Sequence, residues 1–169
     1  MRCWLVIVAV AGVSLVRADD RPSTGPAADY NNPRAFAQGL PTTMVLGFYK
    51  AQDGRELRNA ITQALKYIPE VTTSEFPANH GQPKFLGGDP PVFPYQYKHS
   101  DAGGYAYAFM LVSEEGKVAR VLITDASKPA FAVNAANAVV TWRFKPVSLN
   151  HVHVPFLLMV RVDFAMTGV

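Results

Sequence analysis

Residues 105–124 read YAYAFMLVSEEGKVARVLIT and carry the clearest secondary-structure pattern in the chain. It holds two apolar runs of strand length, 105–112 and 117–124, on either side of the turn sequence Ser113-Glu114-Glu115-Gly116. Tyr, Phe, Val and Ile favour strands, and two such runs joined by a short turn are typical of a β-hairpin. The stretch therefore predicts an antiparallel pair of strands.

A helix and a third strand follow the hairpin. Ser127 and Pro129 are typical of a helix start, and apolar residues then recur at helical intervals as far as Trp142. Residues 155–164 alternate with a period of two, which indicates a strand that is half buried. The order of elements predicts an α+β fold, a two-layer β-β-α-β module with a three-stranded antiparallel sheet.

Residues 1–18 have the parts of a secretory signal peptide. A basic start precedes an apolar run from Trp4 to Val16, and the small residue Ala18 lies just before Asp19. We expect cleavage between Ala18 and Asp19, and therefore export. A helix made of this run spans about 20 Å, short of the roughly 30 Å of a bilayer core. The alternative is that residues 1–18 are retained as a membrane anchor.

Residues 19–90 form a Pro-rich N-terminal region in front of the domain, which we expect to occupy residues 91–169. The first part of this region, 19–40, has the composition of extended or disordered chain because prolines interrupt any periodicity. The last part, 70–91, has the composition of a linker. The region is therefore predicted to be an arm that leads to the domain.

One helix is expected inside this arm, at about residues 55–67. Its apolar positions recur at helical spacing and are Leu57, Ile61, Leu65 and Ile68. Pro69 ends the pattern, and the short apolar stretch Met44–Lys50 in front of it has the character of a strand.

The charge balance and the cysteine count exclude two classes of protein. The chain has 16 Lys and Arg against 13 Asp and Glu. Removing Arg2 and Arg17 with the leader leaves 14 basic residues and a net charge of +1. The charges are scattered, which argues against nucleic-acid binding. The single cysteine, Cys3, lies in the leader and excludes an intrachain disulfide.

The domain resembles the C-terminal domain of the TonB family, the periplasmic proteins that contact outer-membrane transporters. The resemblance covers about residues 91–164 and rests on an ordered set of short motifs. These are Pro91-Val92-Phe93-Pro94, Gly104 and Gly116 around the first strand, Trp142-Arg143-Phe144-Lys145-Pro146 after the helix, and a turn at Asn150. Each of these residues can also be explained by a structural role alone. Large aromatics close the end of a core, Pro146 stops a helix and Gly116 permits a turn.

The sequence departs from the family pattern at three places. His151 stands at a hairpin position that is usually Gly, and the acidic residue near the helix start is absent. The anchor and the long Pro-rich repeat linker of an energy transducer also have no clear counterpart upstream. A soluble periplasmic module is therefore expected, with an anchored TonB-type transducer as the alternative.

The resemblance implies a non-catalytic protein or peptide-binding module, linked to transport at the outer membrane. The implied mode is addition of an extended peptide to an edge strand. The predicted docking edge is 157–163, with Leu157, Met159, Arg161 and Asp163 as its residues. The family pattern also places Tyr105, Tyr107 and Phe109 on the sheet face that lies away from the helix.

An aromatic face of this kind needs a cover. The arm helix, a second copy of the chain in a homodimer, or a partner protein could supply it. In the last case Tyr105, Tyr107 and Phe109 form a binding face.

His151 and His153 are the only residues that suggest a metal. They stand two apart, as ligands on one side of a strand would, but two histidines make only half a site. We therefore expect no metal and no cofactor, with a His-based metal-binding protein as an alternative. The serines lack a nucleophile context and no carboxylate pair has a catalytic pattern, so the chain is not expected to be an enzyme.

Overall fold

The computed structural model describes residues 29–41, 43–48, 72–75, 83–98 and 103–165, together with 55, 59, 62, 63, 65, 66 and 68. Its helices are α1 (Pro33–Ala37), the 3-10 helix η2 (Tyr95–Tyr97) and α3 (Pro129–Val139). Its strands are β1 (Thr43–Phe48), β2 (Thr72–Glu75), β3 (Phe85–Gly87), β4 (Gly104–Val112), β5 (Val118–Ala126), β6 (Arg143–Phe144), β7 (Val147–Leu149), β8 (Val152–Val154) and β9 (Phe156–Phe164).

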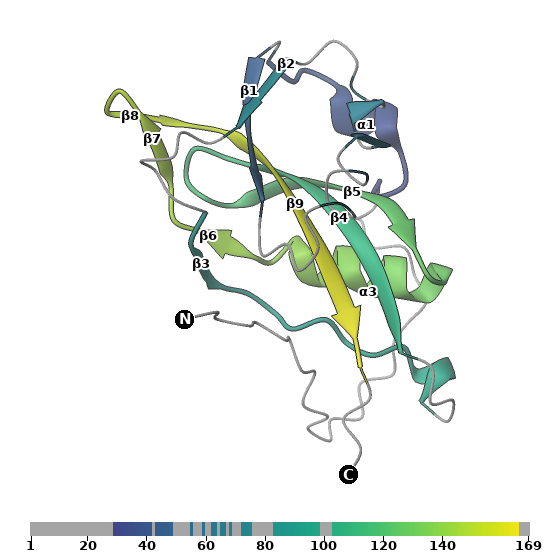
Figure 1. Ribbon diagram of the computed structural model, residues 1–169. Helices are drawn as coiled ribbons and strands as arrows, with labels where there is room; N and C mark the ends of the chain where they lie inside the picture. The colour runs from purple at the N-terminus through teal and green to yellow at the C-terminus, as the bar shows by residue number, and fades with distance from the viewer. Residues whose placement is uncertain are drawn as a thin grey trace.

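The main sheet has five strands in the order β2-β1-β9-β4-β5, and α3 lies across one of its faces (Figure 1). β4 pairs antiparallel with both β5 and β9, over the whole length of β9. These three strands and α3 confirm the predicted β-β-α-β module. Two further strands enlarge its sheet. β1 pairs with the outer edge of β9 and β2 pairs with β1, both in parallel.

Local sequence explains the hairpin and the helix. The Ser113 N–H donates to Lys117 O and the Gly116 N–H to Ser113 O, both at 2.8 Å, which closes the β4–β5 turn. α3 begins at Pro129, where a missing N–H costs no helical hydrogen bond. Lys128, and not Ser127, is the capping residue. The Ser127 hydroxyl instead accepts from the Tyr105 N–H at 3.0 Å and ties the helix start to β4.

The first core fills the space between α3 and the sheet. β9 contributes every second residue to it, namely Phe156, Leu158, Val160, Val162 and Phe164. β4 contributes Ala106, Ala108 and Met110, and α3 contributes Phe131, Ala135, Ala136 and Val139. The predicted inward faces of both strands are therefore confirmed.

A second core lies on the opposite face of the sheet. Its buried members are Phe36, Met44, Leu46, Ile68, Tyr107, Phe109, Leu122, Leu157 and Met159. The first four come from the N-terminal arm, which folds back on the domain. The arm helix was one of the predicted covers, and its residues Leu65 and Ile68 are part of this core. Leu57 and Ile61 lie outside the described residues. Because Leu157 and Met159 are buried as well, this end of β9 is covered on both faces, not half buried.

Two expectations for the arm are wrong where the structure describes it. Residues 33–37 form α1, because Asn32 caps the helix by accepting from the Ala35 N–H at 3.2 Å and Pro33 starts it. The segment 70–91 contains β2 and β3 and is not only a linker. The described residues of the predicted helix 55–67 that are helical are Arg55, Asn59, Thr62, Gln63 and Leu65.

The β7–β8 hairpin turns at Asn150 and His151, which have φ values of 50° and 67°. Two left-handed residues are typical of the tight hairpin turn, so His151 adopts the conformation that Gly would reach more easily. None of the helices in the described part of the chain is long and apolar enough to cross a membrane. The predicted signal peptide, residues 1–18, lies outside the described residues.

Candidate functional site

The outer edge of β9, the edge turned away from β4, is the first candidate site. Tyr105 exchanges hydrogen bonds with Ser127, so its backbone groups face β5 and those of its neighbours Gly104 and Ala106 face β9. These two residues pair with Phe164 and Val162. Since backbone direction alternates along a strand, the odd-numbered residues of β9 present their N–H and C=O groups to the outer edge. They are Leu157, Met159, Arg161 and Asp163, the four residues of the predicted docking edge.

β1 occupies half of this edge. Leu46 lies opposite Leu157 and Phe48 lies opposite Met159 in a parallel ladder. The prediction that β9 is an edge strand along 157–163 is therefore wrong at Leu157 and Met159. The physical reason is that the apolar side chains of the arm gain burial by extending the sheet, which also satisfies backbone groups of β9. The described part of β1 ends at Phe48, and none of its described residues pairs with Arg161 or Asp163.

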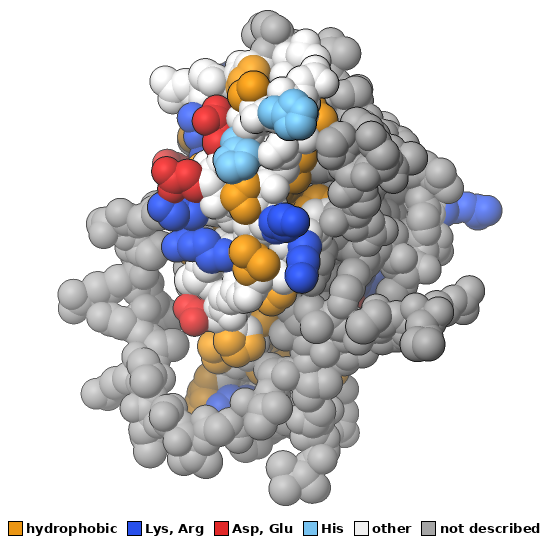
Figure 2. Space-filling view, turned by 90° about the vertical axis from the view of Figure 1, so that its left-hand side faces the viewer, with side chains coloured by type: hydrophobic (Ala, Val, Ile, Leu, Met, Phe, Trp, Pro, Cys, Tyr) orange, Lys and Arg blue, Asp and Glu red, His pale blue; other side chains and the backbone are white. Residues whose placement is uncertain are grey.

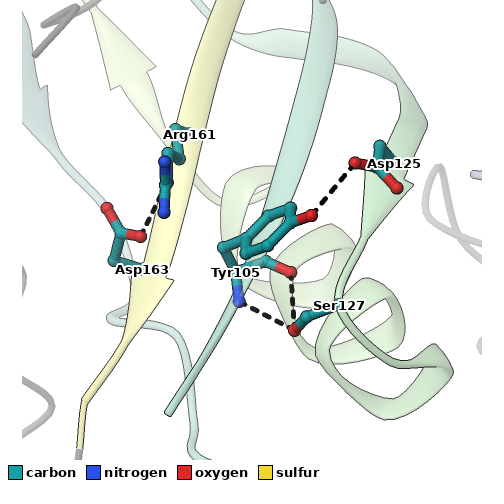
Figure 3. A network of polar contacts seen from close by, with 5 residues as sticks. All are labelled: Tyr105, Asp125, Ser127, Arg161 and Asp163. Atoms are coloured by element: carbon teal, nitrogen blue, oxygen red, sulfur yellow. Dashed lines mark hydrogen bonds and ion pairs between the residues drawn. The ribbon is translucent and has the colours of Figure 1, made fainter. Parts of the chain in front are cut away.

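Arg161 and Asp163 form the polar end of the edge (Figure 3). The Arg161 Nε donates to the Asp163 Oδ1 at 2.8 Å, and their side chains are 39% and 50% exposed. The guanidinium also lies over the ring of Tyr105, 4.9 Å from its centroid, and 5.7 Å from that of Tyr107. The Tyr105 hydroxyl donates to the Asp125 carboxylate at 3.3 Å. The end of β9 at Arg161 and Asp163 is therefore charged, whereas the end that pairs with β1 is apolar.

Burial and pairing act on the pKa of Arg161 in opposite directions. Desolvation lowers it, whereas the hydrogen bond and the charge of Asp163, with a smaller contribution from Tyr107, raise it. The net direction is upward from the ordinary value. The guanidinium of Arg161 therefore stays positively charged at neutral pH, and its ion pair with Asp163 is screened by salt.

The predicted aromatic partner face is largely an interior surface. Phe109 is fully buried and Tyr107 is 8% exposed, and the ring of Phe36 lies 5.5 Å from that of Phe109. The arm of the same chain supplies the cover. Only the end of the face at Tyr105 reaches solvent, where it belongs to the Arg161 cluster.

Gly104 and Gly116 have the structural roles that the motif predicted. A Cβ on Gly104 would lie 2.2 Å from the Phe131 ring, so β4 can approach α3 this closely only without a side chain. Gly116 has φ +79° and a Cβ there would lie 1.9 Å from the Phe144 carbonyl oxygen. The Phe144 N–H in turn donates to Gly116 O at 2.8 Å. The turn and β6 are therefore in direct backbone contact.

Replacing Gly116 by alanine is expected to lower the free energy of unfolding by about 2 kcal/mol or more, because a left-handed residue and a backbone clash add together. Urea unfolding measures the loss. Gly39→Ala is the matched control, since Gly39 has φ +69° and a Cβ added to it would have no atom of the described residues within 4 Å. The control should lose about 1 kcal/mol. Equal losses for the two variants would contradict the close contact with Phe144.

Trp142, Phe144 and Pro146 close the end of the first core. Trp142 Nε1 donates to Asp89 O at 3.0 Å, and the Phe85 ring packs edge-on against both Trp142, at 5.2 Å, and Phe144, at 5.8 Å. Pro146 lies within reach of Gly116. The motif therefore ties β3, β6 and the hairpin turn together, and none of its residues faces a binding site.

His151 and His153 lie on the β7–β8 hairpin. Figure 2 shows histidine side chains, in pale blue, exposed on one face of the molecule. Both are exposed, His151 in the turn and His153 in β8. Within the described residues, no group of three or more His, Cys, Asp or Glu side chains could hold a metal ion. Among the described side chains, the two histidines are therefore not joined by a third ligand.

Sequence reasoning missed how the arm is tied to β5. The Arg120 guanidinium donates to Phe36 O at 2.9 Å and also to Gln38 O, and the Ile123 N–H donates to Tyr30 O at 2.7 Å. These bonds cover part of the outer edge of β5. Asn32-Pro33 is a helix-start signal that could have indicated α1, but no local signal identifies the carbonyls that Arg120 binds.

The edge of a strand in a two-layer α+β domain can bind an extended peptide by strand addition. Residues 89–166 match the family described as Gram-negative bacterial TonB protein C-terminal. This part of the chain is therefore similar to the TonB C-terminal domain family, whose domains take part in TonB-dependent transport through protein interactions.

The chain is also similar to a solved structure, the solution NMR structure of the Pseudomonas aeruginosa TonB C-terminal domain. The two share 19% sequence identity, with a TM-score of 0.44. The match covers 52% of this chain and 89% of that one. No curated protein matches the sequence.

Proposed function

We propose that this chain is a periplasmic, non-catalytic module that binds an extended segment of a partner protein, in transport that depends on TonB-type contacts at the outer membrane. The observation that carries the proposal is the outer edge of β9. Its backbone groups face away from β4, and addition of a strand is the general way in which such an edge binds a peptide. The family match of residues 89–166 supports the transport setting.

Arg161 and Asp163 give the edge its chemical character. Both side chains are partly exposed and are held together by their ion pair, while Tyr105 and Tyr107 lie beneath the guanidinium. A partner strand that pairs here meets a fixed positive and a fixed negative group two residues apart. Such an arrangement favours a partner with polar or charged residues at the matching positions, because charge complementarity selects partner and register.

Asp163→Pro tests this use of the edge. Asp163 is exposed and its N–H points to the outer edge, so proline removes that donor without removing a ladder bond to β4. Asp163→Asn is the matched control, because it also loses the charge that pairs with Arg161 but keeps the N–H. The full chain, immobilised, is incubated with an outer-membrane extract, and a captured TonB-dependent transporter is identified and quantified by mass spectrometry.

We expect the asparagine variant to retain the transporter and the proline variant to capture about tenfold less. Thermal unfolding of both variants checks that each is folded. Equal capture by the two folded variants would place the binding site elsewhere. Failure of the wild-type chain and both variants to capture any such transporter would reject the transport role.

Export is the second part of the proposal, and it is supported by the pattern of residues 1–18. N-terminal sequencing of the protein recovered from cell fractions tests it. A chain in the periplasmic fraction that starts at Asp19 is the expected result. An intact Met1 end in the membrane fraction would favour the anchored transducer instead.

A further inference from the structure

The edge that β1 covers is an edge of the family domain itself. Residues 89–166 contain β4, β5, α3 and β9, and without the arm their sheet would have the order β9-β4-β5 with β9 outermost. β1 and β2 precede this segment. The inference below rests on the proposed function, because it concerns the same edge of β9.

The register shows how much of the edge β1 occupies. Val45, Leu46, Gly47 and Phe48 lie opposite Phe156, Leu157, Leu158 and Met159 in parallel pairing. The described residues of β1 therefore cover the outward backbone groups of Leu157 and Met159 and do not pair with Arg161 or Asp163. A partner strand that pairs with Arg161 and Asp163 and continues along β9 would run into β1.

The slot that β1 fills is apolar on both sides. Met44 and Leu46 are 3% and 5% exposed and pack in the second core, beside Phe109 and Leu157. Val45 is buried in the first core, on the side of Phe156 and Leu158. No polar or charged residue is among the buried residues that the structure describes. An occupant of the slot therefore needs consecutive apolar side chains, because a charge placed there would be buried without a partner.

The arm is attached to the domain as an added layer. Among the described residues, Val45 is the one buried member of the first core that precedes residue 85. β2 joins the main sheet only through β1. The ladder between β4 and β9 runs over nine pairs of residues, and that between β1 and β9 over four. Loss of β1 from the slot therefore leaves the first core and the long antiparallel ladder in place.

We infer that β1 is an intrachain competitor for the binding edge of β9, and that a partner segment binds fully only by replacing β1 in parallel pairing. The chemistry of the partner follows from the apolar half and the charged half of the edge. It is an extended peptide with at least three consecutive apolar residues, which take the places of Met44, Val45 and Leu46. A more polar stretch of the same peptide follows and reaches Arg161 and Asp163.

Leu46→Asp is the variant that empties the slot, because a carboxylate at this buried position favours the state in which β1 is released. Thr43→Asp is the matched control, since it adds the same charge to the exposed start of the same strand. The probe is a fluorescent synthetic peptide of residues 42–50, TTMVLGFYK, whose sequence fits the slot by construction. Fluorescence anisotropy measures its affinity for each full-length chain.

We expect the Leu46→Asp chain to bind this peptide at least about tenfold more tightly than the wild type and the Thr43→Asp control, because apparent affinity scales with the fraction of open slots. Equal affinities for the three folded chains would overturn the inference. Backbone amide spectra of the Leu46→Asp chain check that β4, β5 and β9 keep their pairing.

A reversible disulfide between β1 and β9 tests the same competition if the Leu46→Asp chain does not fold. Leu46 and Leu157 lie opposite each other in neighbouring strands, a separation that suits a disulfide, and the only other cysteine is Cys3. The double variant Leu46→Cys and Leu157→Cys should bind the peptide at least about tenfold more weakly when oxidised than after reduction. Equal binding in both redox states would overturn the inference, and the reduced protein is its own control for the lost leucines.

The same variants separate this inference from the proposed function. If the peptide binds only the open slot but no variant captures an outer-membrane transporter, β1 is a competitor and the transport role is wrong. If the oxidised chain, the Leu46→Asp chain and the wild type all capture the transporter equally, the transport role stands and the competition is wrong.

Discussion

Replacing Trp142 by alanine is expected to lower the free energy of unfolding by about 3–5 kcal/mol. Its indole is 1% exposed, packs edge-on against Phe85 and Phe144, and donates a hydrogen bond to Asp89 O at 3.0 Å. Alanine removes the indole against which the rings of Phe85 and Phe144 pack and leaves a cavity between β3, β6 and α3. Urea unfolding followed by circular dichroism measures the change.

Trp142→Phe separates the hydrogen bond from the packing. It keeps an aromatic ring and loses the N–H that Asp89 O accepts, so it should lose less than the alanine variant while still exceeding the roughly 1 kcal/mol of a typical hydrogen bond. A loss below about 1 kcal/mol for Trp142→Ala would contradict a structural role for this motif. It would reopen the interpretation of Trp142 as a surface residue used for binding.

Replacing Phe109 by alanine is the second change with a large expected effect, a loss of about 3–5 kcal/mol. The ring is fully buried in the second core and lies 5.5 Å from that of Phe36. The same denaturation experiment measures it. The result also tests whether Phe109 belongs to a partner-binding face. A ring on such a face would be exposed in the isolated chain, so its removal would change the free energy of unfolding little.

Leu86→Ala is the matched control for an exposed apolar residue. Leu86 is 59% exposed on β3, so its loss should stay within about 0.5 kcal/mol. If Phe109→Ala behaved like Leu86→Ala, the arm would not cover this face in solution. The proposal that β1 competes for the edge would then lose its basis as well, since Met44 and Leu46 pack in the same core.

The proposals differ from the expectation raised by the family resemblance in one respect. The resemblance implies an edge that is open to a peptide along 157–163, whereas the edge in this chain is divided. Leu157 and Met159 pair with β1, whereas no described residue of β1 pairs with Arg161 or Asp163. The proposed function and the proposed competition by β1 both concern this edge, and its two halves would select different side chains in a partner.

Sequence reasoning succeeded where a local pattern has one structural solution. The hairpin turn, the helix that starts at Pro129 and the alternating strand 156–164 were all predicted close to their observed bounds. Leu157, Met159, Arg161 and Asp163 lie on the same side of β9, but β1 already pairs with the first two, so their role as a docking edge stays a prediction. Sequence reasoning failed for β2, β3 and α1, because short polar or Pro-rich segments become regular only through the strands and side chains that they meet.

For β4 and β9, the alternation of apolar residues in the sequence indicates which face points to α3, because side chains alternate along a strand and apolar residues must be buried. The sequence also indicates the family that residues 89–166 resemble, through motifs whose glycines and aromatics have few structural alternatives. Only the tertiary structure decided what lies on the other face and beside β9. Backbone groups on a strand edge are the same for every sequence, so nothing in the residues of β9 specifies that β1, more than one hundred positions earlier, is the strand that pairs with it.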